Sequence, residues 1–193
     1  QHERSQRFRN PLTTTGAAQV QISGGLASVD GSAANVGAWI PWKTSMPVVL
    51  SSGDGAKSLT VKARNAAALE TDVATLATTL DGTAPTGSAT LLGTVATGTS
   101  TTSTGSAQVT LQLTATDATT SVALLRVANS SAGLATASWR PYTTALPWTL
   151  ATGDGAKTVS VQVQDAAANT SAEFTASIML DTTPMEKARA NRQ

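Results

Sequence analysis

The residues that could perform acid–base or nucleophilic chemistry are few in this sequence. The only histidine is His2, near the start of the chain, and cysteine is absent. A Ser/His/Asp or Cys/His nucleophile system therefore has no general base in the body of the chain, and a zinc site lacks its usual ligands. The 12 acidic residues are scattered, and no pair has a spacing that suggests shared acid–base work. We predict no catalytic residue, no cofactor, and a protein that is not an enzyme.

Calcium is the ligand that the acidic residues could best serve. Asp81 and Asp181 stand at the ends of two repeated segments, where modular β-proteins sometimes bind calcium. A calcium site needs about six or more oxygen ligands, whereas each of these positions offers one or two carboxylates. Asp54 and Asp154 lie inside Gly-Asp-Gly sequences, which favour tight turns. We interpret all four aspartates as turn or linker residues and predict no metal site.

Carbohydrate is the other small ligand that we consider. Trp42, Tyr142 and Trp148 are candidates for contact with a glycan, although packing at the core or at a sheet edge is the alternative. The sequences Asn129-Ser130-Ser131 and Asn169-Thr170-Ser171 match the N-glycosylation pattern, and residues 97–104 could accept O-glycans.

The charge of the chain is small and uneven. A net charge of +1 is too low to attract nucleic acid or an anionic membrane over a distance. The two tails, however, contain a large share of the basic residues: Arg4, Arg7, Arg9, Lys187, Arg189 and Arg192. They are either solvated termini or a means of docking on an acidic surface of a partner.

No apolar run is long enough to span a bilayer, and no signal sequence opens the chain. Because an initiator methionine is also missing, we expect that an upstream segment was removed.

A duplication organises the sequence. Residues 39–83 return one hundred positions later, without a gap, as residues 139–183. The identical positions include the two tryptophans that open the segments, the run Gly-Asp-Gly-Ala-Lys at 53–57 and 153–157, and Leu-Asp at 80–81 and 180–181. Such a repeat indicates one small module used twice.

The modules read as β-structure. Thr, Ala, Ser, Gly and Val dominate, and such side chains suit strands better than helices. Residues 18–22 and 109–115 alternate between apolar and polar side chains, as half-buried strands do, and the former matches 123–127 at an offset of 105. The Gly-Asp-Gly sequences predict hairpins between residues 47–50 and 59–63 and between their counterparts. We predict loops at residues 26–37 and 97–104. Prolines predict that 39–47 and 139–147 lie at sheet edges.

With these residues in view, the second copy resembles the bacterial immunoglobulin-like repeats, which are allied to fibronectin type III modules and occur in bacterial surface proteins and tailed-phage structural proteins. The resemblance covers residues 84–184 well and 17–83 in part. It depends on these segments: Trp139-Arg140-Pro141-Tyr142, Trp148-Thr149-Leu150, Gly153-Asp154-Gly155-Ala156-Lys157, Asp165-Ala166-Ala167-Ala168-Asn169 and Leu180-Asp181-Thr182-Thr183-Pro184. It implies two tandem immunoglobulin-like antiparallel β-sandwiches in an all-β chain.

The sequence departs from this family in two ways. Ala68 and Ala168 stand where such repeats usually carry glycine, which argues against a left-handed turn there. The first copy also begins at the third strand of a sandwich. We therefore predict a basic arm at 1–16, an incomplete module at 17–83, a complete module at 84–184 and a charged tail at 185–193. Either the arm or a strand of another chain completes the first module, or the segment 23–38 closes it.

The expected function is that of a non-enzymatic structural or adhesive module on the exterior of a larger assembly. A bacterial cell surface or an extracellular fibre is the first location, and a phage virion, as a head-decoration or tail component, is the alternative. A carbohydrate-binding module is a further alternative. The expected partners are other protein subunits, reached through strand addition or through the basic arm.

Overall fold

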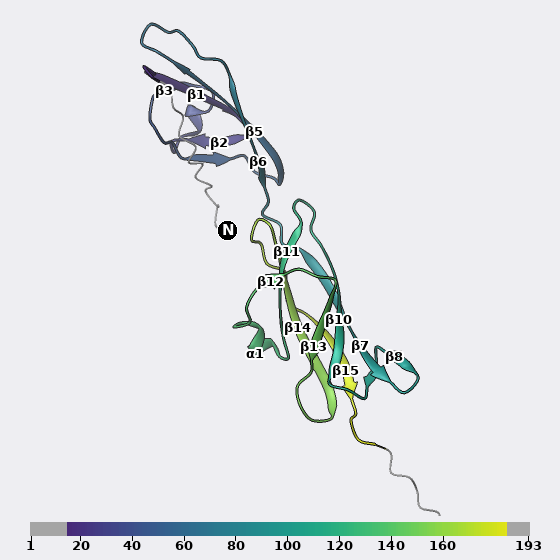
Figure 1. Ribbon diagram of the computed structural model, residues 1–193. Helices are drawn as coiled ribbons and strands as arrows, with labels where there is room; N and C mark the ends of the chain where they lie inside the picture. Colours follow the sequence, from purple (N-terminus) through teal and green to yellow (C-terminus); the bar gives the residue numbers. More distant parts are fainter. Residues whose placement is uncertain (1–14, 185–193) are drawn as a thin grey trace, which may run out of the picture. The chain divides into compact units, whose positions relative to one another are not determined.

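The computed structural model describes residues 15–184, and the chain divides into two compact units after Asp81. Antiparallel strands make up nearly all of the regular structure in both units (Figure 1). The predicted arm and tail lie outside the described residues, apart from Thr15 and Gly16. Within the described range, no helix is long and apolar enough to cross a membrane.

The first unit is a small sandwich of a four-stranded and a two-stranded sheet. The larger sheet has the order β3-β1-β5-β6 and the smaller sheet pairs β2 with β4. The strands are β1 (Gln19–Gly24), β2 (Leu26–Val29), β3 (Trp39–Pro41), β4 (Val48–Leu50), β5 (Gly55–Arg64) and β6 (Ala74–Leu80), with a 3₁₀ turn η1 (Ala33–Asn35) between β2 and β3.

The second unit is a larger sandwich of a four-stranded and a five-stranded sheet. The orders are β13-β10-β7-β8 and β12-β11-β14-β15-β9, and only β9 runs parallel to its neighbour. The strands are β7 (Thr86–Val95), β8 (Gly98–Ser100), β9 (Ser103–Thr104), β10 (Gln108–Thr116), β11 (Val122–Ala128), β12 (Arg140–Pro141), β13 (Ala145–Thr149), β14 (Gly155–Asp165) and β15 (Phe174–Leu180), and a one-turn helix α1 (Ser131–Leu134) follows β11.

The two units share a strand plan. In the first unit β1 lies between the short edge strand β3 and the long strand β5, and β5 pairs with the last strand, β6. In the second unit β11 lies in the same way between β12 and β14, and β14 pairs with the last strand, β15. Both short edge strands, β3 and β12, contain a proline. Val20 of β1 pairs with Ala63, and Leu125 of β11 pairs with Val163. These pairs confirm the offset of 105 read from the sequence. The chain is therefore all-β, with two immunoglobulin-like antiparallel sandwiches.

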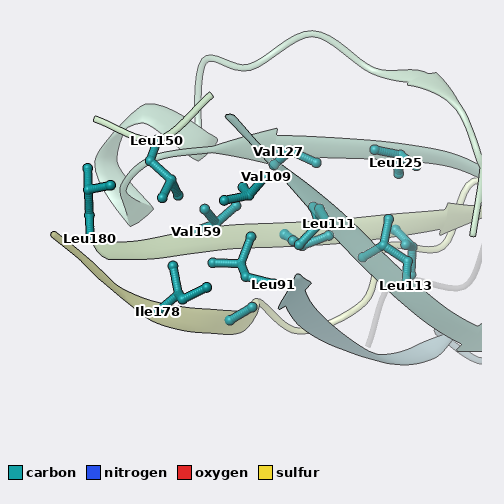
Figure 2. Packing of buried hydrophobic residues seen from close by; sticks show 13 residues of the cluster. Leu91, Val109, Leu111, Leu113, Leu125, Val127, Leu150, Val159, Ile178 and Leu180 are labelled. Atoms are coloured by element: carbon teal, nitrogen blue, oxygen red, sulfur yellow. The ribbon is translucent and has the colours of Figure 1, made fainter. Parts of the chain in front are cut away.

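Aliphatic side chains from both sheets fill the core of the second unit (Figure 2). The strict alternation of β10 places Val109, Leu111 and Leu113 in this core, as the sequence predicted, and Leu111 is fully buried. The first unit has a smaller core around Val20 and Val29. Burial of each such side chain contributes about 1.5–3 kcal/mol, so these cores are the main source of stability in a chain without disulfides.

The predicted Gly-Asp-Gly hairpins are wrong. A turn does form at each site, with positive φ at Gly53, Gly55, Gly153 and Gly155. However, β4 pairs with β2 while β5 belongs to the other sheet, and β13 and β14 are separated in the same way. Each turn therefore leads the chain from one sheet of the sandwich to the other. The local signal identified the turn, but it could not say which strands pair across it.

Two predicted loops contain strands. Residues 26–29 form β2, which pairs with β4 between Leu26 and Leu50 and between Val29 and Val48. Residues 98–100 and 103–104 form β8 and β9, which pair with β7 and β15. These strands are too short to show an alternating pattern, and neighbouring strands of the fold stabilise them.

The left-handed turn that alanine was expected to disfavour is present in both units. Ala68 and Ala168 have φ of 62° and 67°. In the first unit, Asn65 Oδ1 accepts hydrogen bonds from the backbone N–H groups of Ala67 and Leu69, both at 3.0 Å. In the second unit, Asp165 Oδ1 accepts from Asn169 N at 2.8 Å. These bonds offset the strain of a left-handed alanine.

Candidate functional site

The most distinctive surface of the first unit is the inner face of β6, which no further strand of the described unit covers. Leu76, Thr78 and Leu80 point toward the core from this strand but are only half-buried. β6 is also the last strand of its sheet. We call the inner face of β6 and its unpaired edge the open flank.

The second unit shows what covers this surface in a complete sandwich. Ala176, Ile178 and Leu180 of β15 stand at the positions of the three β6 residues and are all buried. β9 pairs with the edge of β15, and β7 packs against its inner face. A methyl group added at Gly93 of β7 would lie 2.9 Å from the Cδ1 atom of Ile178, so this packing is tight.

The first unit has only a partial counterpart of the strands that cover this surface in the second unit. Leu26 pairs with Leu50, while Ala107 O accepts a hydrogen bond from Leu150 N at the same place in the second unit. β2 therefore fills the beginning of the β10 position, and the chain turns away after Val29. Nothing in the described unit stands at the β7 position. The open flank thus offers an unpaired strand edge beside a half-covered apolar face, which is the surface that strand addition uses.

A shallow hollow lies where the chain enters the first unit. It is lined in part by Thr15, Ala63, Arg64 and Leu69, and the loop that leads from β5 into β6 supplies part of its wall. Leu69 is 70% exposed, although Asn169 is buried at the same position in the second unit.

The aspartates that the sequence singled out are turn residues where their contacts are described. Asp154 Oδ1 accepts from Thr182 Oγ1 at 2.7 Å and from Thr182 N at 2.9 Å, and Oδ2 accepts from Thr183 Oγ1 at 2.7 Å. These bonds, with the Thr182 hydroxyl first, lower the pKa of the Asp154 carboxyl. Asp181 Oδ1 accepts from Thr183 N at 3.1 Å. Asp81 is buried, and Asp54 lies in the turn between β4 and β5.

The three aromatic residues considered for glycan contact pack against the cores. Trp42 lies against the core of the first unit, and Tyr142 and Trp148 lie against that of the second. Trp148 Nε1 also donates to Asn129 Oδ1 at 2.8 Å.

The tryptophans that open the repeats each stack with an arginine. Trp39 lies under the guanidinium of Arg64, 4.4 Å from the ring centroid, and Trp139 lies under that of Arg126 at 4.8 Å.

The two matches to the N-glycosylation pattern differ in access. Asn129 is exposed, whereas Asn169 is buried and donates its side-chain amide to Asp165 Oδ2 at 2.8 Å. In the folded second unit, the Asn169 amide is therefore closed to an enzyme that would modify it.

Comparisons with known proteins add little to this description. No protein-family model matches the chain, and no curated protein matches it. Among solved structures, the chain is similar to one described as fibronectin(III)-like modules of CbhA from Clostridium thermocellum, with 14% identity and a TM-score of 0.42. The match covers 94% of this chain and 84% of that one. The fold assignment rests on the strand orders and registers given above.

Proposed function

We propose that this chain is a non-enzymatic structural and adhesive module displayed on the exterior of a larger assembly, at a bacterial cell surface or in an extracellular fibre. The observation that carries the proposal is the use of one sandwich plan twice in tandem, in one unit with a closed sheet system and in one with an open flank. A closed sandwich supplies a stable shape with variable end loops, and an open flank supplies a place for a neighbouring subunit.

The composition of the chain supports a role without chemistry. The only histidine lies in the arm and no cysteine is present, so the sandwiches hold no nucleophile with an imidazole base.

The partner that we propose for the open flank is an extended segment that adds to β6 as a strand. Its backbone would pair with the free edge of β6, and its apolar side chains would cover Leu76 and Leu80. The segment is either the arm at 1–16 or a strand of a neighbouring subunit. The arm enters the unit at Thr15, which lines the hollow together with residues of the loop that leads into β6. About 14 extended residues span about 46 Å, so the arm is long enough to reach the whole of β6.

Hydrogen exchange of the β6 amides tests this partner. If a neighbouring subunit supplies the strand, we expect rapid exchange in the isolated full chain and slow exchange in the native assembly. If a chain that begins at Thr15 exchanges faster at β6 than the full chain does, the arm is the occupant. Equal protection of β6 in the isolated and assembled full chain, unchanged by loss of the arm, would refute strand addition.

A pair of adjacent substitutions provides the matched control. Thr78 lies on the inner face of β6 and is half-buried, whereas Thr79 lies on the outer face and is exposed. We expect Thr78→Lys to prevent incorporation into the assembly, because it places a charge in the strand-addition site. Thr79→Lys should be incorporated normally.

A phage virion protein, as a head-decoration or tail component, is the second candidate function. The open flank favours it too, because a capsid or tail surface can provide the missing strand. Light scattering of the purified chain, followed by electron microscopy of the particle from which it is isolated, separates the two. A monomer that becomes ordered only on a symmetric shell supports the virion, and fibres or cell envelopes support the first proposal.

A further inference from the structure

Two aspartates of the second unit meet at one end of the sandwich, although neither was considered as a ligand from the sequence. Asp117 follows β10, and Asp165 is the last residue of β14. Carboxylate oxygens of the two side chains lie within 4.8 Å of one another. Asp165 is only 3% exposed. The two loops thus bring two acids together in a largely buried place.

One oxygen of this pair lacks a partner. Asp117 Oδ1 accepts from the backbone N–H groups of Thr119 and Thr120 at 2.9 and 2.8 Å. Asp117 Oδ2 is shielded from solvent, yet no hydrogen bond reaches it. A buried carboxylate oxygen without a partner has lost its hydration and gained no hydrogen bond in exchange, which destabilises the folded state.

The two neighbouring carboxylates need a positive charge close to them to offset their mutual repulsion. Two carboxylates this close repel each other, and burial strengthens the repulsion. Both ion pairs found among the described residues belong to the first unit, so neither compensates Asp117 or Asp165.

Hydrogen bonds already engage the other oxygens of the pair. Asp117 accepts two backbone N–H groups, and Asp165 accepts the backbone and side-chain N–H groups of Asn169, both at 2.8 Å. A metal cation neutralises both carboxylates and leaves these bonds in place.

We propose that the second unit binds a calcium ion between Asp117 and Asp165, with the orphan oxygen Asp117 Oδ2 as a ligand. Calcium binds oxygen ligands at about 2.3–2.6 Å, so two of its ligands lie up to about 5 Å apart, which accommodates the observed pair. Magnesium, with bonds of about 2.1 Å, requires stricter octahedral geometry and keeps more of its own waters. Backbone carbonyls and water complete a calcium site in an irregular loop region.

The first unit is a natural negative control for this site. Asn65 replaces Asp165, Leu69 replaces Asn169, and the first unit has no β10 and hence no counterpart of Asp117. Within residues 15–184 the site is therefore expected once. This inference does not depend on the proposed function.

Calorimetric titration of the chelator-treated full chain with calcium chloride tests the proposal. We expect about one calcium ion per chain with a dissociation constant of about 0.1–1 mM, the range of weak calcium sites in proteins, and a rise in the melting temperature with calcium. A calcium concentration of 10 mM is ~10 times the largest expected dissociation constant, so absence of binding at that concentration would overturn the proposal. A response to magnesium but not to calcium would overturn the assignment of the ion.

Substitutions locate the site. Asp117→Asn and Asp165→Asn should each weaken calcium binding at least about tenfold, because the affinity depends on the number of charged ligands. Asp165→Asn should still fold, since Asn65 holds the same turn in the first unit. Asp181→Asn is the matched control, because Asp181 is exposed and closes its own turn with Thr183. Unchanged affinity in both Asp117→Asn and Asp165→Asn would exclude this site.

Discussion

The two sandwiches start from the same repeated sequence and finish with different degrees of closure. Leu80 and Leu180 are identical residues at identical positions, yet Leu180 is 2% exposed and Leu80 is only half-buried. The difference arises from strands that lie outside the repeat, because β7, β9 and most of β10 have no counterpart in the first unit. The burial of a residue is therefore set by neighbours as much as by its own strand.

The largest effect that we predict comes from truncating these two leucines, one in each unit. Leu180→Ala should destabilise the second unit by about 2–5 kcal/mol, because it leaves a cavity in a closed core. Leu80→Ala should cost the first unit less than half as much, since its side chain loses less buried surface. Thermal or urea unfolding followed separately for the two units gives both values. Equal losses would mean that the open flank is covered in solution.

Overpacking of β7 should produce the next largest effect. A methyl group at Gly93 would lie 2.3 Å from the Cβ atom of Thr104, so Gly93→Ala should destabilise the second unit by about 1–3 kcal/mol. At Gly105 the nearest atoms lie 3.8 Å away, and Gly105→Ala serves as the control. Urea unfolding measures both variants. Tolerance of alanine at Gly93 would show that β7 is not held against β9 and β15.

The left-handed alanines offer a smaller effect that the two units should share. Ala68→Gly and Ala168→Gly should each stabilise their unit by about 0.5–1 kcal/mol, because relief of the positive φ exceeds the entropic cost of glycine. Ala67→Gly, one residue earlier and with ordinary φ, should be destabilising. A gain in only one unit would show that the two loops are not equivalent in solution.

The smallest effect concerns pH and belongs to the second unit. The folded state lowers the pKa of Asp154 through hydrogen bonds from Thr182 and Thr183. The ionised carboxylate is therefore favoured by folding above its unfolded pKa, and this stabilisation disappears as the pH falls through the lowered pKa. Asp154→Asn should reduce the loss of stability between about pH 5 and pH 2, measured by urea unfolding at each pH. An unchanged acid profile in Asp154→Asn would contradict this.

Much of the fold follows from local sequence. The alternation in β10 predicted a half-buried strand, and Leu111 is fully buried. The offset of 105 between β1 and β11 was also visible, because both strands carry the same pattern. β2 was missed because a strand of four residues is too short to show an alternating pattern. The sheet to which each strand belongs was missed at the Gly-Asp-Gly turns, because strand pairing depends on residues distant in the sequence.

By itself, the sequence determined that two modules of one plan would form β-structure with aliphatic cores and without cysteine or histidine chemistry in the sandwiches. These features depend on composition, periodicity and repetition, which act over short distances. The tertiary structure alone decided that the first sandwich leaves β6 half-covered and that Asp117 and Asp165 face each other. Both features depend on which loops and strands come into contact after folding. The local sequence around β6, Asp117 or Asp165 does not determine those contacts.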